Sequence, residues 1–163
     1  MRIKHYIVTY NNNPILEKCV RTILATPAGP HAREIFIINN HTNFALPEEL
    51  LSEVTVLHNV LRPDFSTGHL ARNWNQALIA GFQNLRRPIA DIVICCQNDT
   101  EFAPDYLENT IELHKTFDLV STGAGDNCIS YTPRAVKRVG LWDERFCGIT
   151  HQEGDYLLRA AKY

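Results

Sequence analysis

The chain has 163 residues, of which 45% are hydrophobic, so it is long and apolar enough to form one domain with a packed core. Its 16 Lys and Arg residues against 18 Asp and Glu residues give a formal charge of −2, which removes the main electrostatic argument for a nucleic-acid binder, since such a protein should have a basic face. No apolar run approaches the ~20 residues that cross a bilayer, and the first residues contain no signal-peptide core, so we expect a cytoplasmic protein without a transmembrane segment.

Apolar, β-branched runs alternate with helical spacings of apolar residues along the chain. These runs predict strands at residues 3–9, 34–38, 54–57, 90–96, 118–121 and 127–131. Helices are predicted from Pro14 to the turn at 26–30, over 70–82, over 104–114, from Pro133 onward, and over 153–163. Strands that alternate with helical crossovers predict an α/β fold with a mostly parallel central sheet.

We expect residues 1–163 to form a single domain, because the sequence contains no linker and no internal repeat. The last helical pattern is still running at Tyr163, with no C-cap signal behind it. Either the protein is small or the domain is the N-terminal part of a longer chain, and the uncapped helix favours the second interpretation.

Three polar segments follow predicted strands. They are Tyr10-Asn11-Asn12-Asn13, Asn39-Asn40-His41-Thr42 and Gln97-Asn98-Asp99-Thr100-Glu101. In an open parallel sheet, ligands bind outside the carboxyl ends of the strands, so these segments predict a site for a polar ligand. A simpler interpretation is that Asn-rich turns only end the strands, because Asn tolerates left-handed backbone conformations.

The glycine loops that commonly hold phosphates are missing from the sequence. There is no Walker loop, and the turn after the first strand contains no glycine. The one Gly-x-Gly, Gly123-Ala124-Gly125, comes late and is typical of an ordinary loop. A phosphate-bearing ligand would therefore need another source of positive charge, and a divalent metal on Asp99 would supply it, since hard oxygen ligands suit Mg²⁺ or Mn²⁺.

Five short motifs, taken in order, resemble glycosyltransferase family 2. They are Ile7-Val8-Thr9-Tyr10-Asn11, Ile37-Ile38-Asn39-Asn40, Gln97-Asn98-Asp99-Thr100-Glu101, Gly140-Leu141-Trp142-Asp143-Glu144-Arg145-Phe146 and Gln152-Glu153-Gly154-Asp155-Tyr156-Leu157-Leu158-Arg159-Ala160. The resemblance covers essentially the whole chain. It implies the GT-A fold, a Rossmann-like three-layer sandwich, and inverting transfer of a sugar from a nucleotide-diphosphate donor, with a UDP-sugar as the expected donor.

The resemblance implies a set of nucleotide-binding residues. Thr9, Tyr10 and Asn11 are expected to line the nucleobase pocket. Asn39 stands where the family usually has an Asp that accepts from the uracil N3–H, and its amide oxygen can still accept that hydrogen bond. Arg72, within a family-like Ala-Arg-Asn, is a candidate for contact with the base or the phosphates, or else an exposed helix residue.

The family's Asp-x-Asp metal motif corresponds to Gln97-Asn98-Asp99. Only its last carboxylate, Asp99, is present, as in rhamnosyl- and galactofuranosyltransferase-like members. We therefore expect Asp99 to bind Mn²⁺ or Mg²⁺ and Asn98 to contact the nucleotide. His151 could add an imidazole ligand, although a surface histidine is the favoured interpretation.

The resemblance places the general base at the start of the last helix, where Glu153 is favoured over Asp155. A carboxylate there would take the proton of the acceptor hydroxyl as that hydroxyl attacks the anomeric carbon. Either side chain could instead only stabilise the helix N-terminus. Trp142 could line the sugar pocket or pack in the core.

The sequence thus predicts a metal-dependent hexosyl- or deoxyhexosyltransferase that acts on a glycan or another hydroxyl acceptor. A non-catalytic nucleotide-sugar- or carbohydrate-binding module of the same fold is the alternative, because two family carboxylates are replaced at Gln97 and Asn39. A sugar-phosphate nucleotidyltransferase is disfavoured, since the glycine- and Arg-rich loop of those enzymes is missing after the first strand.

Overall fold

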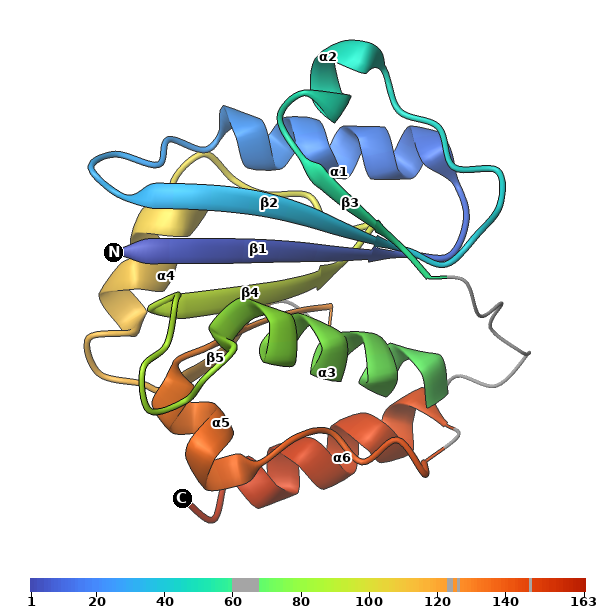
Figure 1. Cartoon of the computed structure of the whole chain (residues 1–163). Coiled ribbons are helices and arrows are strands. Elements are labelled where there is room, and N and C mark those ends of the chain that lie inside the picture. Colours follow the sequence, from blue (N-terminus) through green and yellow to red (C-terminus); the bar gives the residue numbers. More distant parts are fainter. Residues whose placement is uncertain (60–67, 123–124, 126, 147) are drawn as a thin grey trace.

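The computed structural model describes residues 1–59, 68–122, 125, 127–146 and 148–163, with the backbone alone at 68 and 69 (Figure 1). The described strands form one sheet in the order β3-β2-β1-β4-β6-β5. The strands are β1 (Arg2–Thr9), β2 (Ala32–Asn39), β3 (Thr55–His58), β4 (Ile92–Gln97), β5 (Leu119–Thr122) and β6 (Cys128–Tyr131). β3, β2, β1 and β4 are parallel, whereas β6 is antiparallel to both β4 and β5. The predicted mostly parallel sheet is confirmed.

Helices cover both faces of the sheet (Figure 1). The helices are α1 (Asn13–Ala25), α2 (Glu48–Leu51), α3 (Gly68–Phe82), α4 (Tyr106–Leu113), α5 (Pro133–Val139) and α6 (Ile149–Ala160). Leu16 of α1 and Leu107 of α4 belong to the apolar cluster on one face. Trp74 of α3 and Tyr156 of α6 belong to the cluster on the other face. The expected three-layer arrangement is therefore present.

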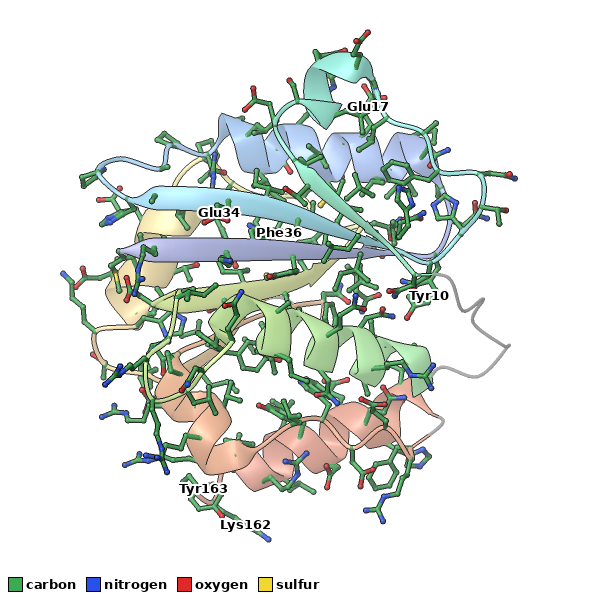
Figure 2. The ribbon with its side chains drawn as sticks, viewed as in Figure 1. Tyr10, Glu17, Glu34, Phe36, Lys162 and Tyr163 are labelled. Carbon is green, nitrogen blue, oxygen red and sulfur yellow. The ribbon has the colours of Figure 1, made fainter. Side chains whose placement is uncertain are left out.

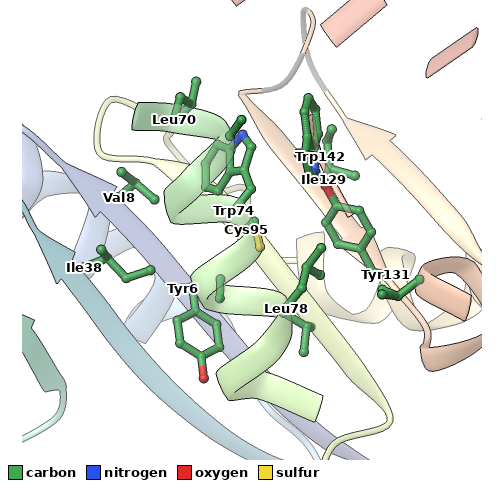
Figure 3. Close-up of a cluster of buried hydrophobic side chains, with 14 of the residues drawn as sticks. Tyr6, Val8, Ile38, Leu70, Trp74, Leu78, Cys95, Ile129, Tyr131 and Trp142 are labelled. Atoms are coloured by element: carbon green, nitrogen blue, oxygen red, sulfur yellow. Dashed lines mark hydrogen bonds between the residues drawn. The ribbon is translucent and has the colours of Figure 1, made fainter. Parts of the chain in front are cut away.

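β1 is buried on both faces because its side chains alternate between the two clusters. Tyr6 and Val8 pack toward α3, whereas Ile3 and Ile7 pack toward α1, as the two-residue period of a strand requires. Figure 3 shows the α3 side of the core, where Trp74 is the largest side chain that is fully buried. Full burial of each aliphatic side chain contributes about 1.5–3 kcal/mol, so this double packing holds the central strand in place.

Trp142 is a packing residue. Its side chain is 3% exposed, and its ring stacks on Tyr156 with 4.2 Å between the ring centroids. Its Nε1–H donates to the Tyr131 hydroxyl at 3.1 Å. These contacts join the segment before α6 to β6, so of the two interpretations offered for Trp142 the structure supports the core.

The boundaries of some helices differ from the prediction. The last helix is Ile149–Ala160 instead of 153–163. Its N-cap residue, Gly148, forms no side-chain cap bond, so no sequence signal marks the start of the helix. The helix expected over 104–114 is Tyr106–Leu113, and the short α2 was not predicted. Among the helices that the structure describes, none combines the length and the apolarity needed to cross a membrane.

Candidate functional site

The carboxyl ends of β1, β2 and β4 lie side by side. Thr9 is the register partner of Asn39, and the backbone N–H of Asn98 donates to the Val8 carbonyl at 3.1 Å. The structure thus brings together the three polar segments that the sequence singled out. Since all three strands are parallel, their polar ends form one edge, which is where α/β sheets bind ligands.

Asn98 joins the segment after β4 to the segment after β1. Its Nδ2 donates to the Thr9 hydroxyl at 3.1 Å and to the Asn11 carbonyl at 2.8 Å. Asn12, the next residue, has a left-handed backbone with φ 72° and caps α1 by accepting from the Ile15 N–H at 3.3 Å. The Asn-rich turn therefore does end its strand, as the simpler interpretation expects, and at the same time it lines the edge of the sheet.

The side-chain amide of Asn39 forms hydrogen bonds with other residues of the protein. Its side chain is 3% exposed. Its Oδ1 accepts from the His41 N–H at 3.2 Å, while its Nδ2 donates to the His41 carbonyl at 2.8 Å and lies 3.0 Å from Nδ1 of His58. The amide that replaces the family's Asp thus holds the β2 turn to β3, and its contact with a nucleobase stays a prediction.

Two other polar groups at this edge have no hydrogen-bond partner in the described part of the chain. They are Oδ1 of Asn13 and both ring nitrogens of His41, all of them buried atoms. Burial lowers the pKa of His41, which favours the neutral imidazole with one donor and one acceptor nitrogen. Buried polar groups are nearly always bonded in native proteins, so these atoms mark unused hydrogen-bonding capacity at the site.

Asp99 is exposed in the turn that follows β4. The turn is fixed by the Thr100 N–H, which donates to the Gln97 carbonyl at 3.2 Å, and by the Thr100 hydroxyl, which donates to the Asn127 carbonyl at 3.2 Å. The Gln97 side chain donates to Oδ1 of Asn127 at 3.4 Å, so an amide takes the place of the first family carboxylate. Asp99 therefore supplies the one carboxylate of this turn.

Glu153 lies against the segment that links β5 to β6. A Cβ atom on Gly125 would come within 2.9 Å of both carboxylate oxygens of Glu153, and Gly125 has a left-handed backbone with φ 66°. Only a glycine meets both conditions without strain. Gly125 belongs to the late Gly-x-Gly, whose other two residues lie outside the described part of the chain. Asn127, in the same link, contacts the turn that carries Asp99, so the link adjoins both candidate carboxylates.

Asp155 has a different environment. Its Oδ2 accepts from Nε of Arg159 at 2.9 Å, and Arg159 also donates to the carbonyls of Val139 and Leu141 at 2.6 Å and 3.0 Å. Arg159 therefore joins α6 to the end of α5, and Asp155 pairs with it within α6. The choice of Glu153 over Asp155 as the base stays a prediction.

Gln152 joins α6 to α3, a contact that the motif containing it did not predict. It is 1% exposed, and its Oε1 accepts from the Ala71 N–H in α3 at 3.2 Å. Its Nε2 donates to the Phe146 carbonyl at 2.7 Å. Gln152 thus docks the start of α6 on the start of α3 and places its neighbour Glu153. No local signal marks the contact with Ala71, because Ala71 and Gln152 are 81 positions apart in the chain.

The remaining candidates lie on the surface. Arg72 is exposed on α3, with Nε 3.6 Å from Oε2 of Glu144, and the other Glu144 oxygen accepts from Asn75 at 2.8 Å. His151 is exposed on α6. The nucleotide contact of Arg72 stays a prediction. Two cavities, of about 530 and 330 Å³, lie away from this edge, the first beside the loop before β2 and the second beside α5.

Comparison with known families identifies the chain. The profile of the family described as Glycosyl transferase family 2 matches residues 6–138. The chain belongs to glycosyl transferase family 2. The resemblance drawn from the motifs is thus confirmed at the level of the family, while the rhamnosyl- or galactofuranosyltransferase-like variant stays a prediction. Comparison with curated proteins gave no match.

Solved glycosyltransferase structures share the fold of this family 2 member. The mannosyltransferase PcManGT from Pyrobaculum calidifontis, solved with GDP-Man and Mn²⁺, is 17% identical with a TM-score of 0.65, and the match covers 92% of this chain and 50% of that one. Residues 1–349 of S. aureus TarS are 9% identical with a TM-score of 0.67, covering 98% and 55%. The chain therefore spans about half the length of these structures, and the likeness confirms the GT-A fold.

Proposed function

We propose that the chain is the nucleotide-sugar domain of a metal-dependent inverting glycosyltransferase. It transfers a hexosyl or deoxyhexosyl group from a UDP-sugar to a hydroxyl of a glycan or another acceptor. The supporting observation is that Asp99 and Glu153 both lie beside the β5–β6 link at the polar edge of the sheet. The unbonded atoms of Asn13 and His41 at the same edge are consistent with a polar ligand there.

Glu153 is the proposed general base. Inverting transfer needs a carboxylate that takes the acceptor's proton while the acceptor oxygen attacks opposite the leaving diphosphate. A base must also reach the acceptor hydroxyl, and a carboxylate that is engaged by a neighbouring side chain is not free to do so. Asp155 is held in this way by Arg159, whereas Glu153 forms no ion pair within the described residues.

Asp99 is the proposed metal ligand, for Mn²⁺ or Mg²⁺. The described residues contain no group of three His, Cys, Asp or Glu side chains that could hold a cation alone. Magnesium, however, usually binds through one or two carboxylates, substrate phosphates and water, so one exposed carboxylate fits a cation that arrives with the nucleotide. Such a cation acts as a Lewis acid toward the departing diphosphate.

The finer assignments rest on the motifs. The sequence Asn98-Asp99-Thr100, with one carboxylate, supports the rhamnosyl- or galactofuranosyltransferase-like variant. Tyr10 and Asn11 at the end of β1 are the proposed contacts of the nucleobase, together with Thr9. The cytoplasmic location stays a prediction.

Calorimetric titration with UDP, GDP and dTDP tests the proposed function, each nucleotide being measured with Mn²⁺ and with EDTA. We expect UDP to bind more tightly than the others and to lose affinity in EDTA. Metal-independent binding would contradict the role of Asp99, and no binding of any of the three would contradict the nucleotide-sugar assignment. A preference for GDP or dTDP would contradict the UDP-sugar donor alone.

A non-catalytic nucleotide-sugar-binding module is the second candidate. The internal bonds of Asn39 and the amide of Gln97 favour it, because neither side chain offers the carboxylate of the family. Donor consumption separates the two candidates. When an acceptor hydroxyl or water is present, an enzyme releases UDP from a UDP-sugar. A binding module binds the UDP-sugar and leaves it intact.

A further inference from the structure

The hydroxyl group of Tyr10 is held by a hydrogen bond from a residue of α3. Tyr10 is 36% exposed and lies at the carboxyl end of β1 (Figure 2). The phenol oxygen accepts from Nδ2 of Asn73 in α3 at 2.7 Å, and Asn73 is 1% exposed. An exposed tyrosine usually rotates about its side-chain bonds, but this one is attached to a buried amide.

The orientation of the Asn73 amide is set by a further amide. Its Oδ1 accepts from Nδ2 of Asn59 at 3.0 Å, so its Nδ2 must point toward Tyr10. Asn59, next to the end of β3, also donates to Oδ1 of Asn40 at 2.8 Å, and its Oδ1 accepts from Nε2 of Gln76 at 3.1 Å. The bond to Asn59 thus orients the Asn73 amide so that its nitrogen faces the Tyr10 hydroxyl.

The chain of amides closes on the residue next to Tyr10. Asn40, 8% exposed after β2, donates from Nδ2 to the Thr9 carbonyl at 3.2 Å. The bonds thus run from the Thr9 backbone through Asn40, Asn59 and Asn73 and return at the Tyr10 hydroxyl. We call these three asparagines the amide chain. A closed set of this kind fixes the ring of Tyr10 relative to the end of its own strand.

We propose that Asn73 is a positioning residue for the nucleotide, which acts through the amide chain to hold the Tyr10 ring ready for the flat face of a nucleobase. This inference rests on the proposed function. A planar base stacks on an aromatic ring with a gain that depends on the ring's orientation. A ring that is fixed before binding loses little conformational freedom when the base arrives, so the affinity is higher than with a free ring.

A double-mutant cycle tests the proposal, with calorimetric Kd values for UDP in Mn²⁺ as the readout. The variants are Tyr10→Phe, Asn73→Leu and the double variant. Each single change is expected to weaken binding about 3- to 10-fold, the net value of one hydrogen bond. The double variant should be no weaker than the weaker single one, because both changes remove the same contact.

Thr26→Val is the matched control for loss of a buried polar group. The Thr26 hydroxyl is buried at the end of α1 and donates to the Thr22 carbonyl at 3.0 Å, away from the amide chain. This variant should lower the melting temperature and keep the wild-type Kd. Tyr10→Phe retains the ring and every buried amide, so it tests the proposal even where Asn73→Leu does not fold.

The outcomes separate the inference from the proposed function. Wild-type affinity in Tyr10→Phe, or effects of the two changes that simply add, would overturn the positioning role while nucleotide binding stands. A lower melting temperature with unchanged Kd in Asn73→Leu would show a purely structural role and would also overturn it. Failure of the wild-type protein to bind UDP, GDP or dTDP would overturn both.

Discussion

Glu153 and Asp155 are two positions apart on α6 and point to different neighbours. A helix turns by about 100° per residue, so the two side chains are about 200° apart around the axis. Glu153 faces Gly125, and Asp155 faces Arg159 and the end of α5. At the scale of single residues, one carboxylate borders the β5–β6 link and the other pairs with Arg159.

Glu153→Gln is expected to lower turnover by about 10²–10⁴-fold, because an amide cannot take the acceptor's proton. Affinity for UDP should stay near that of the wild type. Asp155→Asn is the matched control, since it should lower the melting temperature and retain most of the turnover. Donor-consumption rates and calorimetry check both variants, and full activity in Glu153→Gln would refute the base assignment.

Asp99→Asn is expected to abolish the metal dependence of nucleotide binding. The amide oxygen is a weaker ligand than a carboxylate for a hard divalent cation. The Kd for UDP measured with Mn²⁺ should rise to the value measured in EDTA. Asp105→Asn, an exposed change next to α4, serves as the control and should bind as the wild type does. A metal effect that survives in Asp99→Asn would place the cation elsewhere.

Gly125→Ala should disturb Glu153 directly. The new Cβ would meet the Glu153 carboxylate at 2.9 Å, so the base must move, and misplacement by about 1 Å can cost about 100-fold in rate. Gly29→Ala is the matched control: Gly29 also has a positive φ, of 57°, but nothing within 4 Å of an added Cβ. Both variants should lose stability, and only Gly125→Ala should lose turnover. Equal turnover in the two variants would contradict the contact's role.

At the scale of the elements, the docking of α6 on α3 depends on Gln152. Replacing it by Leu leaves the buried Ala71 N–H without its acceptor, which costs about 1–3 kcal/mol of unfolding free energy. Denaturant unfolding measures this loss. His151→Leu, an exposed change on the same helix, should stay within about 0.5 kcal/mol of the wild type. A Gln152→Leu protein as stable as the wild type would mean that α6 docks by its apolar contacts alone.

The strands could be predicted because they are rich in apolar, β-branched residues, most continuously in β4, whose first five residues are buried. The start of α6 could not, because Gly148 offers no cap signal and Ile149 to Gln152 show no early acidic residue. The short α2 has neither a side-chain cap bond nor the length for an apolar period. Local patterns thus predict the elements that bury most surface and miss ends that tertiary contacts stabilise.

The segments of the candidate site that come immediately after strands could be predicted from the sequence. Asn98 and Asp99 are next to β4 in the sequence, and the fold brings them to the edge where parallel strands end. The amide chain could not be predicted, because Asn40, Asn59 and Asn73 meet only through the arrangement of β2, β3 and α3. Each asparagine by itself is typical of an ordinary turn or helix surface.

At the scale of the whole molecule, a buried histidine makes the free energy of unfolding depend on pH. His5 is 2% exposed in β1, and burial, aided by the charge of Arg33, lowers its pKa to about 3. The unfolded chain, with a pKa near 6.5, binds the proton more readily, so protonation favours unfolding. The contribution of His5 is complete above pH 6.5 and is lost as the pH falls toward 3.

The unfolding free energy should therefore decrease below pH 6.5, by up to about 1.4 kcal/mol per pH unit for this one proton. His5→Leu should show a flatter profile between pH 3 and 6.5 in denaturant titrations. His151→Leu, which removes an exposed imidazole, should retain the wild-type slope. Parallel profiles for the wild type and His5→Leu would show that other groups govern the acid response.

During synthesis on the ribosome, β4 is made well before the strand that pairs with its second edge. The nascent chain must still produce α4 and β5 before Cys128, the first residue of β6, can insert between β4 and β5. Until then the open edge of an apolar strand can pair with another chain. A chain released between residues 97 and 127 should therefore self-associate, and in the cell it would be a substrate for chaperones or proteases until the last strand closes the sheet.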